Sequence, residues 1–146
     1  MRRFLMCAAA MAVVWGMAIG HAQMKVTNLE EHDKAMKALG GAFGGANKAV
    51  AAGSMADVKT ALATLKSTLM AVEGFWAANK KTAQVDFAKA AIAKVDVADK
   101  AASGTDTAAV GAAVKDIITA CGACHTATRE PDPATPKSFI VKAGIL

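Results

Sequence analysis

Tyrosine is absent from this sequence of 146 residues, and proline and cysteine occur only three times each. Aromatic residues make up 5% of the chain, and alanine fills many of its apolar positions. Large side chains give a core most of its buried apolar area, so this composition predicts a thin hydrophobic core. No segment shows the strand alternation and turn signals of a β-hairpin. Evenly spread lysines and few aromatics exclude a nucleic-acid-binding surface.

The first 22 residues have the three-part composition of a secretory signal peptide. A basic start is followed by residues 4–20, which carry no charge, and Gly20 and Ala22 place small residues at a cleavage site. A membrane anchor is the alternative, but 17 apolar residues are few for a helix that crosses a bilayer. We therefore expect cleavage before Gln23 and export to the periplasm.

Removal of residues 1–22 leaves a chain with room for one domain. Cys7 and two of the 17 basic residues leave with this segment, so 15 basic and 12 acidic residues give a net charge of +3. The remaining sulfur- and imidazole-bearing residues are few: Cys121, Cys124, His32, His125, Met24, Met36, Met55 and Met70.

Four segments place apolar residues three and four positions apart, which is the period of an amphipathic helix. The first runs from a cap at residues 27–28 to Val50, the second from Ser54 to Trp76, the third from about Thr82 to Ala102, and the fourth from a cap at residues 103–106 to about Arg129. Residues 74–81 are expected to connect the second helix to the third, in part as helix. The expected inward stripe of the first helix is Leu29, His32, Met36, Leu39, Phe43, Ala46 and Val50.

These helices and their short connections predict an all-α fold, an antiparallel up-down-up-down four-helix bundle. The bundle is expected to span residues 23–130. Pro131 and Pro133 end the last helix, and residues 131–146 form a C-terminal extension that packs on the bundle or trails from it.

The last helix carries Cys121-Gly122-Ala123-Cys124-His125, the attachment signature of haem c. Cysteines three residues apart lie on one face of a helix, so both thiols can add to the two vinyl groups of one porphyrin. The histidine that follows supplies the proximal iron ligand. Haem is coupled to such motifs outside the cytoplasm, in agreement with the signal peptide. The sequence therefore predicts one covalently attached haem c.

Three other functions of the cysteine pair agree less well with the sequence. A redox-active dithiol has its cysteines at a helix N-terminus after a strand, whereas these lie about 15 residues into a helix. A disulfide between residues three apart in a helix has poor geometry. A zinc site needs a fourth ligand, for which His32 is the remaining strong candidate.

The position of the motif, close to the C-terminus on the last helix of a predicted bundle, resembles class II c-type cytochromes, the cytochrome c′ group. The resemblance covers the chain after residue 22 and implies the four-helix bundle of that group. Arg129, four residues after His125, matches a basic residue that the family keeps there. Met36-Lys37 is similar to the Met-Lys pair of low-spin members, in which the methionine is the sixth iron ligand. Residues 129–142 resemble a C-terminal extension of some small monohaem relatives.

Position along the bundle also indicates Met36 as the sixth ligand. It lies about eight residues, or roughly 12 Å, into the first helix, level with His125 near the end of the antiparallel fourth helix. Met55 is expected at the opposite end, Met70 lies off the stripe of its helix, and Met24 precedes the first helix. His32, one turn from Met36 on the same stripe, and an iron without a second protein ligand are the alternatives.

The sequence leaves open the roles of two glycines and one arginine. Gly40 and Gly44 each cost about 1 kcal/mol of helix propensity, which the approach of a flat ring, a kink or a close helix contact would explain. Arg129 is expected to tune the proximal histidine, to pair with a haem carboxylate, or to be an exposed cation at a helix end. Trp76 and Phe43 are expected to be walls around the macrocycle.

The function that these residues favour is one-electron transfer by a periplasmic monohaem cytochrome. A histidine–methionine iron stays low-spin and has a raised potential. No acid–base pair or second cofactor motif accompanies the haem signature, so we do not expect an enzyme. The alternatives are a five-coordinate binder of nitric oxide or carbon monoxide, and a haem subunit of a larger oxidoreductase. Expected partners are soluble or membrane-bound redox proteins, and a second copy through the first two helices.

Overall fold

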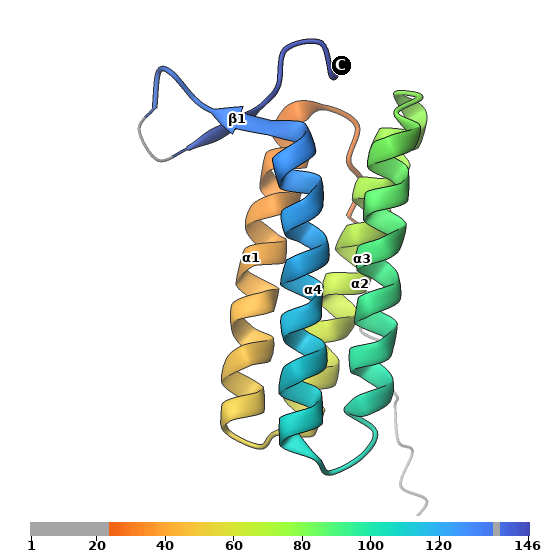
Figure 1. Ribbon diagram of the computed structural model, residues 1–146, viewed down its shortest axis with the longest axis vertical. Coiled ribbons are helices and arrows are strands. Elements are labelled where there is room, and N and C mark those ends of the chain that lie inside the picture. Colours follow the sequence, from red (N-terminus) through yellow and green to blue (C-terminus); the bar gives the residue numbers. More distant parts are fainter. Residues whose placement is uncertain (1–23, 136–137) are drawn as a thin grey trace, which may run out of the picture.

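The computed structural model describes residues 24–135 and 138–146 of the chain. Four helices, α1 (Leu29–Ala51), α2 (Met55–Ala78), α3 (Thr82–Ala101) and α4 (Thr107–Thr128), run up and down in sequence order (Figure 1). Each packs against the next, and α1 also contacts α4. The predicted four-helix bundle is therefore confirmed. The predicted signal peptide lies outside the described residues.

Polar residues at the expected positions begin the first and last helices. The Asn28 side chain accepts a hydrogen bond from the Glu31 backbone N–H at 2.9 Å, and the Glu31 carboxylate accepts one from the Thr27 backbone N–H at 2.6 Å. Asp106 accepts from the backbone N–H groups of Ala108 and Ala109. These contacts satisfy N–H groups that a helix start leaves without partners.

The connection between α2 and α3 is shorter than the sequence indicated. Residues 74–78 continue α2, so only residues 79–81 form the turn. Lys80 has a φ of 57°, and the Lys81 backbone N–H donates to the Trp76 carbonyl at 2.9 Å. This is a Schellman ending, in which a left-handed residue follows the helix. A lysine occupies the position that glycine usually takes, so no glycine marks the end of this helix.

Two groups of buried side chains make up the core. The larger one joins all four helices through residues such as Leu62, Val95, Val110 and Val114, each no more than 1% exposed. The smaller one lies at the end of the bundle where α1 begins, and contains Val26, Ala35, Val72, Phe75 and Trp76. The predicted stripe of α2 is buried from Val58 to Trp76. On α1, however, Leu29 is 49% exposed, because this first residue lies at the outer end of the bundle.

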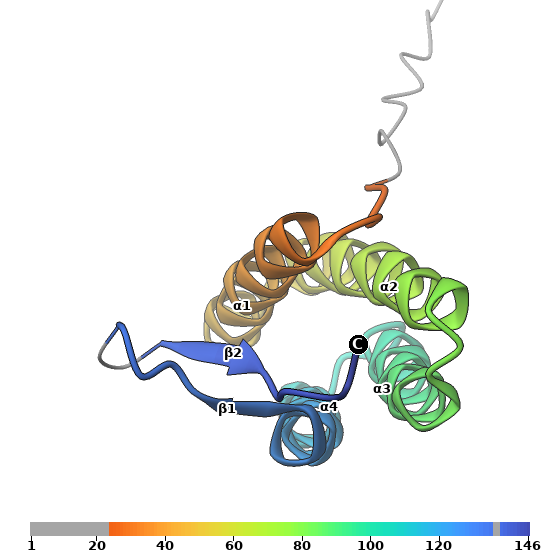
Figure 2. The same cartoon turned by 90° about the horizontal axis from the view of Figure 1, so that it is seen from above.

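A small antiparallel sheet follows α4, which the sequence analysis did not predict. Strand β1 (Arg129–Pro131) pairs with β2 (Phe139–Val141), and Arg129 lies opposite Val141. Three-residue strands are too short to show an alternating pattern. The Lys142 backbone N–H donates to the Thr128 carbonyl at 2.9 Å, and Val141 and Ile145 pack against the smaller core group. The C-terminus thereby lies over the end of the bundle (Figure 2).

The helix α4 is long and apolar enough to cross a membrane when only length and composition are considered. That is weak evidence, since a core helix of a bundle meets the same criterion. Here α4 packs along α3 and contacts α1, and it buries Val110, Val114 and Ile117 in the larger core group. The seam between α4 and α1 is the least closely packed of the four helix–helix seams.

The first prediction tests the core. Leu62→Ala removes a side chain that is 1% exposed, so it should lower the free energy of unfolding by about 2–5 kcal/mol. Leu29→Ala makes the same change at an exposed position and should change it by less than about 1 kcal/mol. Urea denaturation of both variants measures the difference. Equal losses would show that the core is not where the structure places it.

Candidate functional site

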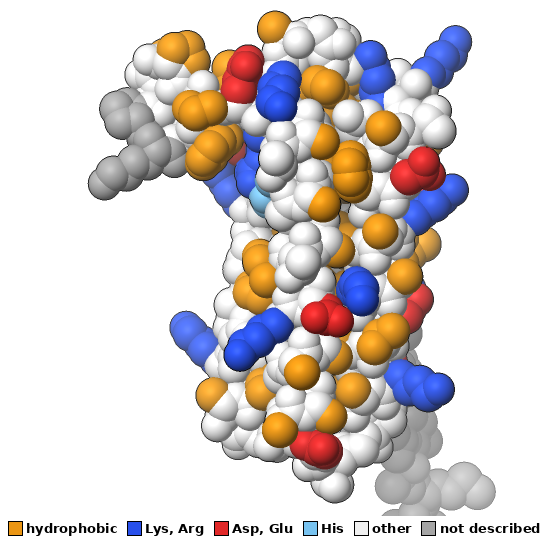
Figure 3. Space-filling view, in the orientation of Figure 1, with side chains coloured by type: hydrophobic (Ala, Val, Ile, Leu, Met, Phe, Trp, Pro, Cys, Tyr) orange, Lys and Arg blue, Asp and Glu red, His pale blue; other side chains and the backbone are white. Residues whose placement is uncertain are grey.

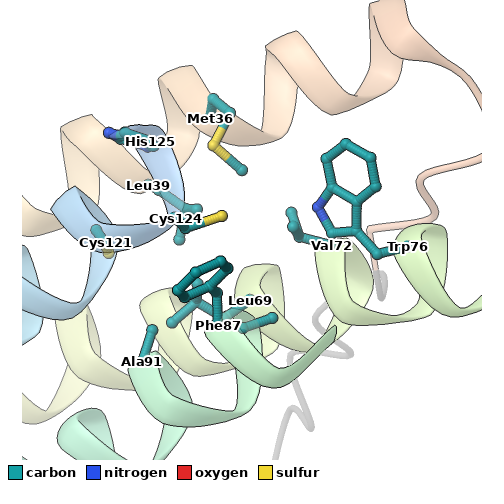
Figure 4. Close-up of a pocket in the computed structure, with 11 residues that line it drawn as sticks. Met36, Leu39, Leu69, Val72, Trp76, Phe87, Ala91, Cys121, Cys124 and His125 are labelled. Carbon is teal, nitrogen blue, oxygen red and sulfur yellow. The ribbon is translucent and has the colours of Figure 1, made fainter. Parts of the chain in front are cut away.

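An apolar cavity lies at the end of the bundle that carries the cysteine motif. Side chains from all four helices line it: Met36, Leu39, Leu69, Val72, Trp76, Phe87, Ala88, Ala91, Cys121, Cys124 and His125. It holds about 360 Å³, including its opening. The sulfur atoms of Met36 and Cys124 point into the space that Phe87, Val72 and Trp76 enclose (Figure 4).

A second cavity of about 460 Å³ lies beside the first, at the seam between α1 and α4. Met36, Leu39, Cys121 and His125 line both cavities, so the two adjoin at these residues. Gly40 and Phe43 of α1 line only the second. Trp76 lines the first cavity and Phe43 the second.

The two cysteines lie on one face of α4, half-buried, and neither forms a disulfide. Burial raises the pKa of both thiols, and for Cys121 the neighbouring Cys124 raises it further. Both groups are therefore protonated near neutral pH. The Cys124 sulfur lies 3.7 Å from the Thr128 hydroxyl, one helical turn on. Thr128 is 2% exposed, and the sequence analysis did not identify it because a threonine at a helix end carries no distinctive signal.

His125 is half-buried beside the same cavities. Burial is the main cause that lowers the pKa of its imidazole from 6.5 to about 4, and the charges of Arg129 and His32 lower it further. Among the described residues, no carboxylate raises this pKa. The imidazole is therefore neutral at neutral pH, which is the form that binds a metal ion.

Arg129, at the end of α4, is partly buried. Its backbone is extended at the end of α4, and its guanidinium carbon lies 5.3 Å from the ring centre of Phe139. Its Nε atom is buried and has no hydrogen-bond partner among the described residues. The guanidinium acts on the pKa of His125, His32, Cys121 and Cys124, so it lies near all four. The interpretation of Arg129 as an exposed helix-end cation is therefore wrong.

Met36 and its competitor His32 have different surroundings in the structure. Met36 lines both cavities, whereas His32 lines neither. The imidazole of His32 lies 5.2 Å from the ring of Phe75 and 5.1 Å from that of Trp76, and burial lowers its pKa. His32 is therefore part of an aromatic cluster in the smaller core group.

The other methionines lie elsewhere. Met55 begins α2 and packs against the larger core group, and the side chains of Met24 and Met70 are 38% and 47% exposed. Met36 is the methionine that lines the cavities beside His125.

Gly40 and Gly44 do not mark a close contact between helices. A Cβ atom added at either position would meet no atom within 4 Å outside the helix itself. Gly40 lines the second cavity, so its missing side chain leaves that space open. Among the interpretations of these glycines, the close helix contact has no support.

The alternative functions of the motif find no support in this geometry. Among residues 24–135 and 138–146, no three His, Cys, Asp or Glu side chains come together to hold a metal ion such as zinc. The pKa of each thiol is raised, whereas the thiol of a reactive dithiol has a lowered pKa.

Comparison with protein-family models, curated proteins and solved structures finds no match to this chain.

The second prediction concerns the imidazole of His125 in the chain without a bound group. Its pKa is 6.5 when unfolded and about 4 when folded, so the unfolded chain binds more protons between these values. Stability therefore falls as pH falls through this window. His125→Gln should therefore lose less free energy of unfolding than the parent chain between pH 7 and pH 4.5. Urea denaturation of both proteins at the two pH values measures the difference.

Arg129 provides a matched control for this titration. Arg129→Gln removes a positive charge near His125, so it should raise the pKa of the imidazole, as measured by NMR of the ring protons. Lys115→Gln, an equal change of charge at an exposed position of α4, should leave the pKa of His125 where it was. A pKa of His125 close to 6.5 in the folded parent would contradict both the burial and the charge effect.

Proposed function

We propose that this chain is an exported c-type cytochrome that carries one haem and transfers one electron at a time. The observation that carries the proposal is the position of Cys121, Cys124 and His125. All three line an apolar cavity at one end of a four-helix bundle. Attachment of a porphyrin needs two thiols and one neutral imidazole on the same wall of such a space.

The donor groups suit haem attachment. A thiol adds across a vinyl group by placing its sulfur on one carbon and its hydrogen on the other. Burial raises the pKa of both thiols, so each is protonated near neutral pH, and neither forms a disulfide that would block the addition. The neutral imidazole of His125 has a free lone pair for iron. Bound haem would supply a redox-active iron that accepts and returns one electron.

The shape of the site also supports a flat apolar group. The two adjoining cavities enclose about 360 and 460 Å³ between atoms, open solvent included, and mainly apolar side chains line both. Small residues keep this space open, among them Ala88, Ala91 and Gly40. The thin core expected from the sequence would gain apolar volume from the macrocycle.

We propose Met36 as the sixth ligand. Its thioether points into the space beside the cysteines, on α1, across from the helix that carries His125 (Figure 4). A thioether and an imidazole keep iron low-spin and raise its potential, which suits an electron carrier. The role that we propose for Arg129 is to keep the imidazole of His125 neutral, because its positive charge disfavours protonation of that ring.

The third prediction tests haem attachment. The parent chain, expressed with the machinery that matures c-type cytochromes, should keep its haem after denaturation and extraction with acidified organic solvent. Cys124→Ala should lose most of the bound haem, because one thioether and the recognised motif are gone. Thr126→Ala, an exposed position on the same helix, should retain it. Extraction of free haem from the parent chain would overturn the proposal.

The fourth prediction tests the sixth ligand. Met36→Leu keeps most of the packing but removes the thioether, so the iron should become high-spin and bind carbon monoxide quickly. Met55→Leu makes the same change at the far end of the bundle and should leave the spectrum unchanged. Absorption spectra of both oxidation states measure the outcome. A parent protein that is high-spin and binds carbon monoxide quickly would favour the gas-binding alternative over electron transfer.

A further inference from the structure

A second hollow lies outside the two cavities, between α1 and the β1–β2 hairpin; we call it the hairpin cleft. It holds about 1240 Å³, including open solvent at its mouth. Met36 is the one residue that lines both this cleft and the cavities beside the cysteines. Figure 3 shows the hairpin overhanging the bundle, with hydrophobic side chains gathered on it and the surface hollowed beneath.

Large apolar side chains line the cleft but remain exposed. Leu29 on α1 and Phe139 and Ile140 on β2 are 49%, 57% and 42% exposed. They come from segments 110 or more positions apart in the sequence, and the fold of the hairpin over α1 brings them to one hollow. Exposed apolar groups that converge on a concave surface are typical of a site that binds an apolar body.

The charges in the cleft leave one cation without a counter-ion. Lys37 and Asp33 pair with each other at 2.6 Å. Asp132 accepts hydrogen bonds from the Ala134 backbone N–H and the Ser138 hydroxyl, within its own hairpin. Arg129 makes no ion pair with any described residue, and its buried Nε lacks a hydrogen-bond partner. His32 is buried and forms no ion pair among these residues.

We propose that the hairpin cleft binds a small amphipathic carboxylate. The carboxylate accepts hydrogen bonds from the guanidinium of Arg129, whose planar donors match two carboxylate oxygens. The apolar body lies between Leu29 and the side chains of Phe139 and Ile140. The cleft adjoins the proposed haem site at Met36, which lines both.

Calorimetric titration of the mature, haem-loaded protein with 4-phenylbutyrate tests the proposal. One molecule should bind per chain. Acetate, which lacks the apolar body, and 4-phenylbutanol, which lacks the charge, should each bind roughly tenfold to a hundredfold more weakly. No saturable binding of 4-phenylbutyrate, or equally tight binding of 4-phenylbutanol, would overturn the proposal. A haem carboxylate bound to Arg129 would give the first of these results, and Arg129 would then not be open to a ligand, so the proposal would be overturned in that case too.

Variants separate the two parts of the site. Arg129→Gln should weaken 4-phenylbutyrate binding roughly tenfold or more and leave 4-phenylbutanol unaffected. Phe139→Ala removes an exposed side chain of the hairpin and should weaken both. Lys37→Gln changes a charge that Asp33 already neutralises and should weaken neither. Unchanged binding of the acid in Arg129→Gln, or equal loss in Lys37→Gln, would show that the acid binds elsewhere.

Discussion

The burial of one face of α2 is the constraint on which the other parts of the structure depend. Val58 and Leu62 are at most 1% exposed and join the helices in the larger core group. Further along the same face, Val72 and Trp76 line the cavity beside the cysteines. One continuous apolar stripe therefore stabilises the bundle at one end and forms a wall of the site at the other.

The order of the helices explains why the site lies where it does. Each helix packs closely against its neighbour in sequence, whereas α1 and α4 are the first and last and meet across the least closely packed seam. Met36 and His125 come from these two helices and line the same two cavities. A group inserted there would be held by residues from both sides of the seam.

The β1–β2 hairpin changes the environment of the residues at this end. Val141 and Ile145 cover the aromatic cluster that holds His32, and Phe139 packs against the guanidinium of Arg129. Arg129 is thereby partly buried near His125 and the cysteines. Its charge contributes to a neutral imidazole, as the proposed iron ligand requires, and remains available to an anion in the hairpin cleft.

The sequence by itself determined the number of helices, their order and most of their buried positions, because a 3.6-residue period of apolar side chains is a local property. It also indicated the cysteine motif, Met36 and the aromatic walls, since the spacing of residues on a helix fixes the face that they share. Only the tertiary structure decided that α2 continues through Gly74, that Leu29 is exposed and that Arg129–Pro131 pairs with Phe139–Val141. It alone placed Met36, and not His32, beside the cavities, and it alone showed that Arg129 is partly buried. Each of these depends on contacts between segments far apart in the chain, which no local pattern records.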